Sequence, residues 1–96
     1  MAEKDVLTQE EIKSQLEEVN EWELKDSNKL FREFSFKNFK EALAFTNEVG
    51  EVAEDKMHHP DIYLTWGVVK IEITTHEADG LTTDDFDLAK AIDKKV

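Results

Sequence analysis

All three histidines of the sequence, His58, His59 and His76, lie in one short stretch, and two carboxylates accompany them. Glu54 lies four residues before His58, and Asp85 lies in the segment that follows His76. Imidazole is the side chain whose unperturbed pKa lies closest to neutrality, so it can both give and take a proton at pH 7. A carboxylate that contacts an imidazole fixes its tautomer. The five residues therefore indicate a site for general acid–base chemistry.

The expected secondary structure would bring these five residues together. Glu54 and His58 are spaced to share one face at the end of a helix. His59 lies at the exit of that helix and precedes a proline, which disfavours the helical conformation for it. We expect His76 to end the last strand, with its ring on the side opposite to the buried residues. Asp85 would lie in the first turn of the next helix, so strand ends and helix ends meet at the site.

Each residue taken alone also fits a structural role. A histidine such as His58 near a helix C-terminus interacts favourably with the helix dipole, as does an acid such as Asp85 near a helix N-terminus. His59 fits a loop residue before proline, and His76 fits a polar residue at a strand end. The convergence of all of them on one place favours the functional interpretation.

Two chemistries could use these residues. The first is a metal site with Glu54, His58, His59 and His76 as ligands. Adjacent histidines in an extended chain point to opposite sides, and no HExxH spacing is present, so we expect no metal. The second is metal-free acid–base catalysis, in which imidazoles approach a substrate from different sides. A dehydration needs that arrangement, because one group protonates a leaving hydroxyl and another removes a proton from the neighbouring atom.

Length and charge limit the possible functions. Ninety-six residues fit a single domain, 1–96, with one modest core. The net charge of −11 repels phosphate backbones, so we expect no nucleic-acid partner. No apolar run exceeds Ala42–Phe45, and the start MAEKDVLTQEE has no apolar signal region, so we expect neither membrane insertion nor secretion. The absence of cysteine excludes a disulfide framework and is compatible with a cytoplasmic location.

The hydrophobic pattern predicts seven elements in the order αββαββα. A capping box from Thr8 to Glu11 predicts the start of the first helix. Gly67 and Gly80 mark turns, and Pro60 ends the second helix. The expected elements are a helix over 9–20, strands near 22–25 and 29–36, a helix from 39 that stops by 59, strands near 62–66 and 69–74, and a helix from 83.

These elements predict an α+β fold, with four antiparallel strands in one sheet and the helices packed on one face. In the second helix we expect one buried stripe, and we expect Gly50 to mark a close-packed or bent part of it. The residues expected on that stripe are Phe39, Ala42, Leu43, Val49 and Ala53.

The pattern of site residues resembles the signature of the pterin-4a-carbinolamine dehydratases. It runs Glu54-x3-His58-His59-Pro60, then Trp66, His76 and Asp85 after intervals of five, nine and eight residues. The wider run AEDKMHHPDIYLTWGVVKIEITTHEADGLTTDDF is similar to that family over its length, and the resemblance extends from about residue 6. Trp66 fills an aromatic position that the family also fills with Tyr or Phe, and the loop EADGLTTDD is more acidic than expected for the family.

The resemblance implies an enzyme that dehydrates 4a-hydroxytetrahydropterin to quinonoid dihydropterin, the recycling step after an aromatic amino acid hydroxylase. It implies active-site roles for His58, His59 and His76. Glu54 and Asp85 are the supporting carboxylates, and His59 and Trp66 are expected to contact the pterin. We expect His58 and His76 to exchange protons with the C4a hydroxyl and N5, Glu54 to steer His58, and Asp85 to steer His76.

The same resemblance implies no cofactor, since the pterin is the substrate, and a homodimer or homotetramer joined through sheet edges and helix faces. The alternative function is a non-catalytic oligomeric module of the same fold that binds a pterin or a protein.

Overall fold

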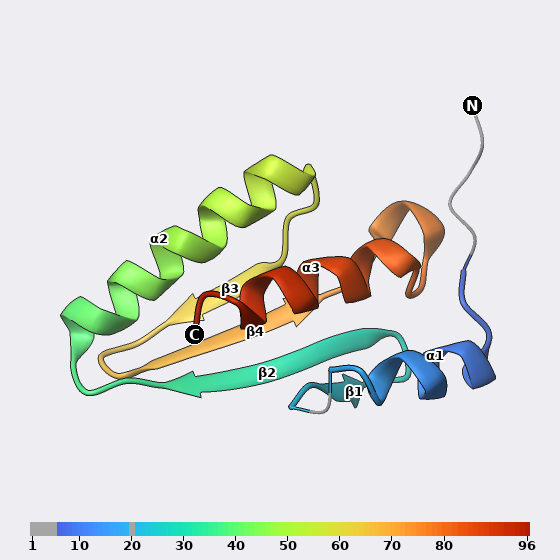
Figure 1. Ribbon diagram of the computed structural model, residues 1–96, viewed down its shortest axis with the longest axis horizontal. Helices are drawn as coiled ribbons and strands as arrows, with labels where there is room; N and C mark the ends of the chain where they lie inside the picture. Colours follow the sequence, from blue (N-terminus) through green and yellow to red (C-terminus); the bar gives the residue numbers. More distant parts are fainter. Residues whose placement is uncertain (1–5, 20) are drawn as a thin grey trace.

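The computed structural model describes residues 6–19 and 21–96, and its elements follow the expected order (Figure 1). The helices are α1 (Gln9–Leu16), α2 (Phe39–Lys56) and α3 (Thr83–Asp93). The strands are β1 (Glu23–Lys25), β2 (Lys29–Ser35), β3 (Asp61–Leu64) and β4 (Val68–Ile73), and a 3₁₀ turn covers His76–Ala78. The predicted α+β fold with αββαββα order is confirmed.

The four strands form one antiparallel sheet in the order β1-β2-β4-β3. Leu30 of β2 lies opposite Ile73 of β4, and Ile71 of β4 lies opposite Ile62 of β3. Because side chains alternate along a strand, this register places the buried residues of β2 and β4 on one face. Those residues are Leu30, Phe34, Val69, Ile71 and Ile73.

The helices share one core with that face of the sheet. Ile12 of α1, Phe45 of α2 and Phe86 of α3 are all buried in the same hydrophobic cluster as the inward strand residues. Figure 1 shows α2 and α3 lying along the same side of the long strands β2 and β4. The site must therefore form at an end of this layered structure, where helices and strands meet through loops.

The buried stripe of α2 differs from the predicted one. Ala42, Phe45, Val49 and Ala53 are buried, and their spacing of three or four residues follows one side of the helix. The prediction that Phe39 and Leu43 belong to this stripe was wrong. Both lie beside the buried stripe, with 43% of Phe39 and 40% of Leu43 exposed.

The first helix is shorter than predicted. It begins at Gln9 behind the expected capping box, in which Thr8 and Glu11 bond to each other's backbone N–H groups. It ends at Leu16, and Val19 is buried from the turn that follows. The predicted end at residue 20 lies outside the described residues.

A polar clamp holds the C-terminal end of α3 against the sheet. Asp93 Oδ1 accepts hydrogen bonds from Trp22 Nε1 at 2.9 Å and from Arg32 Nη1 at 2.7 Å. The guanidinium of Arg32 also lies over the Phe34 ring, 4.3 Å from its centroid. Because α3 is fixed at this end, the position of its first turn, which carries Asp85, is defined as well.

In the part of the chain that the structure describes, none of the helices is long and apolar enough to cross a membrane.

Gly50 lies in the middle of α2 without any contact that requires a glycine. The helix runs through it without a break, and a Cβ at this position would meet no atom within 4 Å. The prediction of close packing at Gly50 was therefore wrong. A glycine inside a helix costs roughly 0.5–1 kcal/mol relative to alanine.

We expect Gly50→Ala to raise the free energy of unfolding by about 0.5–1 kcal/mol, because it removes this cost and adds no clash. Urea denaturation measures the change. The matched control is Gly67→Ala in the β3–β4 turn, where a Cβ would lie 3.1 Å from the Phe36 carbonyl oxygen and should destabilise the protein. A loss of stability in Gly50→Ala would show that the helix is strained or covered at this point.

Candidate active site

The C-terminal end of α2 sets the direction of both neighbouring histidines. Met57 adopts the left-handed conformation, with φ 54° and ψ 40°. The N–H of His58 donates to the Ala53 carbonyl at 3.1 Å, and the N–H of Met57 donates to the Glu54 carbonyl at 3.2 Å. This is a Schellman motif, and it turns the chain out of the helix immediately before His58.

His58 is bonded to a fully buried carboxylate. Its Nε2 lies 2.6 Å from Oδ1 of Asp85, whose side chain is 0% exposed, while that of His58 is 14% exposed. The other oxygen, Oδ2, accepts hydrogen bonds from Thr75 Oγ1 and from the Thr82 backbone N–H, both at 2.8 Å. An ionised carboxylate can only accept hydrogen bonds, so with Asp85 ionised Nε2 is the protonated nitrogen of His58 in this pair. The neutral ring then presents Nδ1 as its basic nitrogen.

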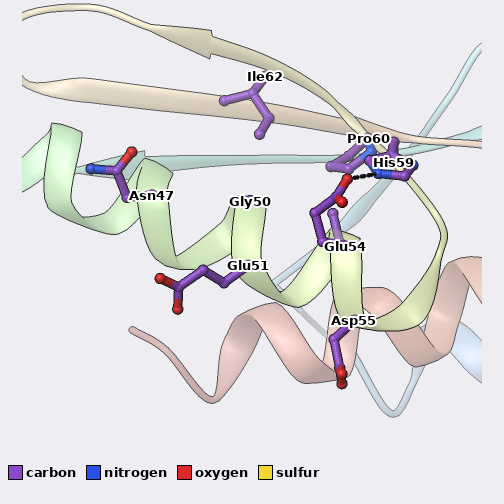
Figure 2. Close-up of a pocket in the computed structure, with 9 residues that line it drawn as sticks. Asn47, Gly50, Glu51, Glu54, Asp55, His59, Pro60 and Ile62 are labelled. Carbon is purple, nitrogen blue, oxygen red and sulfur yellow. Dashed lines mark hydrogen bonds and ion pairs between the residues drawn. The ribbon is translucent and has the colours of Figure 1, made fainter.

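His59 forms a second, exposed pair with the other predicted carboxylate. Its Nε2 lies 2.5 Å from Glu54 Oε2, and the two side chains are 54% and 75% exposed. Both residues line an open cleft of about 920 Å³ between α2 and β3. Figure 2 shows Glu54 reaching from α2 to His59 beside Pro60, while Ile62 of β3 lies across from Gly50.

The predicted pairing of carboxylates with histidines was wrong. Glu54 pairs with His59 instead of His58, and Asp85 pairs with His58 instead of His76. The prediction assumed that the helix continues to His58, which would place that ring over Glu54. The helix instead ends at Lys56, two residues before His58, and the left-handed Met57 redirects His58 toward α3.

His76 directly follows Thr75 in the chain and lies in a different element from the one predicted. Strand β4 ends at Ile73, and His76 begins the 3₁₀ turn that follows, so the prediction that it ends the strand was wrong. Its side chain is exposed, as expected. The preceding residue, Thr75, is bonded to Asp85, so the backbone that carries His76 is fixed to the same carboxylate as His58.

The two adjacent histidines border different hollows. His58 lines a second cavity of about 260 Å³ together with Asp55, Lys56, Asp84 and Asp87. His59 lines the larger cleft, and His76 lines neither of these two. The structure thus joins the end of α2, the end of β4 and the start of α3 through Asp85, but it does not place the three imidazoles around one of these hollows.

Trp66 is not brought together with the histidines. It lies in the β3–β4 turn, beyond the far end of β3 from Pro60, and it is 68% exposed. Six residues of extended chain span about 20 Å, which is more than a pterin ring bridges. Within one chain, the predicted contact of Trp66 with the same ligand as His59 therefore has no geometric support.

The described residues, 6–19 and 21–96, contain no group of three or more His, Cys, Asp or Glu side chains arranged to hold a metal ion. The donor set of the site is instead two separate imidazole–carboxylate pairs. Such pairs orient an imidazole for proton transfer.

Sequence reasoning missed Thr75 and Thr82, the two threonines that contact Asp85. The signal for Thr75 was present, because it continues the inward row Val69, Ile71 and Ile73 at the same parity, and its side chain is buried. Thr82 is the residue before α3, where a hydroxyl commonly caps a helix, so its burial against the site was hidden by a structural role.

Comparison with known proteins points to one family. Residues 5–95 match the family described as pterin 4 alpha carbinolamine dehydratase. A relative from Alkaliphilus metalliredigens, provisionally named a pterin-4-alpha-carbinolamine dehydratase, is 48% identical over 93% of this chain and 81% of its own length. A relative from Picosynechococcus with the same provisional name is 49% identical over 92% of this chain and 95% of its own length. A Brucella melitensis crystal structure, titled transcriptional coactivator/pterin dehydratase, is 27% identical, with a TM-score of 0.89 over 95% of this chain and 98% of that one.

We expect Asp85→Ala to lower the free energy of unfolding by about 3–5 kcal/mol, because it leaves His58, the Thr75 hydroxyl and the Thr82 N–H without their buried acceptor. Urea denaturation followed by circular dichroism measures this loss. The matched control is Asp87→Ala, two residues further along α3 and exposed, which should leave the midpoint unchanged. A loss below about 1 kcal/mol for Asp85→Ala would contradict a buried three-way acceptor.

Proposed function

We infer that this chain, which belongs to the pterin-4-alpha-carbinolamine dehydratase family, converts 4a-hydroxytetrahydropterin to quinonoid dihydropterin and water. One observation carries the inference beyond family membership. His58 is held by a buried carboxylate through one ring nitrogen, which leaves the other nitrogen as a base of fixed orientation, and the same carboxylate holds Thr75, the residue before His76.

The reaction needs one proton delivered and one removed. The C4a–O bond breaks as a proton is given to the leaving hydroxyl, which departs as water. The N5–H proton is taken away, and the electron pair of that bond forms the C4a=N5 double bond. Atoms and charge balance without an oxidant, so two proton-exchanging groups are sufficient.

The histidines supply these groups in the proposed mechanism. His58 accepts the N5 proton on Nδ1, since its Nε2 donates to Asp85. His76, exposed on the 3₁₀ turn, donates to the hydroxyl, and His59 orients the ring with Glu54 as its partner. This mechanism requires the pterin to reach imidazoles that border separate cavities in the free protein. Glu54 and Asp85 thus act as supporting carboxylates, each for a different histidine than the sequence suggested. No cofactor or metal ion takes part in this proposal.

Membership of this family also suggests a metabolic role for the reaction. The product would be recycled to the tetrahydropterin used by an aromatic amino acid hydroxylase, and the predicted cytoplasmic location stays a prediction. We also propose a homodimer or homotetramer. The exposed Phe39 and Leu43 of α2 and the edge strand β3 support it, because a second copy of the chain would cover them. Phe39 and Leu43 would serve equally in the alternative function, a non-catalytic binding module.

We expect His58→Ala and His76→Ala to lower kcat by about 100-fold or more, because each removes one proton-exchanging group. His59→Ala should mainly raise KM, since its proposed role is orientation. The assay follows dehydration of chemically generated 4a-hydroxytetrahydropterin above the uncatalysed rate, with Glu77→Ala, exposed beside His76, as the control. Wild-type protein that does not exceed the uncatalysed rate would favour the binding module.

We expect a dihydropterin analogue to raise the thermal unfolding midpoint, because a ligand that binds only the folded state stabilises it. Zinc and a chelator should leave the midpoint unchanged. Stabilisation by zinc that the chelator reverses would contradict the metal-free mechanism, and no response to the pterin would contradict pterin binding at this site.

A further inference from the structure

Behind His58 lies a buried chain of hydroxyl groups that the proposed reaction does not use directly. Thr75 and Thr82 are 1% and 2% exposed, and their Oγ1 atoms lie 3.0 Å apart. Thr75 Oγ1 is also 2.8 Å from Asp85 Oδ2. This series of hydrogen bonds therefore runs from Thr82, the residue before α3, through Thr75 after β4 to the Asp85 carboxylate that holds His58.

The direction of these hydrogen bonds follows from the inventory of donors. A hydroxyl has a single hydrogen, and a carboxylate has none. Thr75 must therefore donate to Asp85, and Thr82 must donate to Thr75. Oδ2 of Asp85 is therefore the final acceptor of this series of hydrogen bonds. The Thr82 backbone N–H is a second donor to the same oxygen.

The consequence concerns the rotation of the carboxylate. His58 contacts only Oδ1, and a carboxylate held at one oxygen can turn about its Cβ–Cγ bond. Two donors on Oδ2, one from β4 and one from the start of α3, fix the second oxygen as well. Oδ1 then keeps its direction toward Nε2 of His58, and the ring keeps its tautomer.

We propose that Thr75 is a positioning residue for the dehydration, which holds Asp85 through its hydroxyl so that His58 stays Nε2-protonated and presents Nδ1 to the substrate. Thr82 orders the Thr75 hydroxyl and has a lesser effect. This inference rests on the proposed function for its effect on turnover, but its effect on His58 is independent of the substrate.

The decisive variant is Thr75→Val, which keeps the shape of the side chain and removes the hydroxyl. We expect kcat to fall about 10-fold to 100-fold with KM little changed. This is the range typical when a group that contacts the substrate loses the hydrogen-bond partners that orient it. Thr75→Ser keeps the hydroxyl and should restore kcat to within about threefold of wild type. The matched control is Thr46→Val, which removes a half-buried hydroxyl bonded within α2 to the Ala42 carbonyl and should leave kcat unchanged.

A second readout separates this proposal from the proposed function. Imidazole ¹⁵N spectra of the full chain, at a pH where His58 is neutral, should show the Nε2-protonated tautomer in wild type, Thr75→Ser and Thr46→Val. Thr75→Val should show a mixture of tautomers. If the wild type has no dehydratase activity, the proposed function fails, and the tautomer still decides whether Thr75 positions His58.

An unchanged tautomer in Thr75→Val, or an unchanged kcat in an active protein, would overturn the proposal. If Thr75→Val does not fold, Thr82→Val decides, since it removes the hydroxyl that donates to Thr75 and caps α3 but keeps the backbone N–H that donates to Asp85. In Thr82→Val, a loss of kcat smaller than the one expected for Thr75→Val, or a partial shift of the His58 tautomer, supports the proposal. A wild-type kcat together with a wild-type tautomer overturns it.

Discussion

The site depends on one buried carboxylate. Asp85 has no exposed surface, and a charge in that position is tolerated only when its oxygens are fully paired. Its partners come from three separate segments: His58 after α2, Thr75 after β4, and the Thr82 N–H before α3. Each of these segments follows or precedes an element that packs on the same core. The fold therefore supplies donors to Asp85, and Asp85 in turn fixes the loops that carry the histidines.

This constraint divides the site into a rigid part and an open part. The His58–Asp85 pair is largely buried and is held from behind by hydroxyls, so its geometry is set before any substrate arrives. The His59–Glu54 pair is exposed at the mouth of a wide cleft, where solvent weakens the attraction between the two side chains. The first arrangement suits proton transfer, which needs fixed geometry, and the second suits recognition of a ligand that enters and leaves.

Much of the fold could be predicted because its local signals agree. The capping box at Thr8, the alternation in β4 and the turn at Gly67 each specify an element by itself. The residue types and their spacing indicated five candidate residues, and the structure joins four of them in two pairs. Their pairing could not, because it depends on the backbone of Met57, a residue type that gives no sign of a left-handed conformation. Phe39 and Leu43 were misplaced for a related reason, since hydrophobicity does not say which flank of a helix the core covers.

A crystal structure of the protein with a bound dihydropterin analogue tests the central claim most directly, through the two distances at His58. The account predicts that Nε2 remains within hydrogen-bonding distance of Asp85 Oδ1, while Nδ1 lies within hydrogen-bonding distance of pterin N5. A pterin bound away from His58, or a His58 ring turned so that Asp85 no longer contacts Nε2, would contradict it.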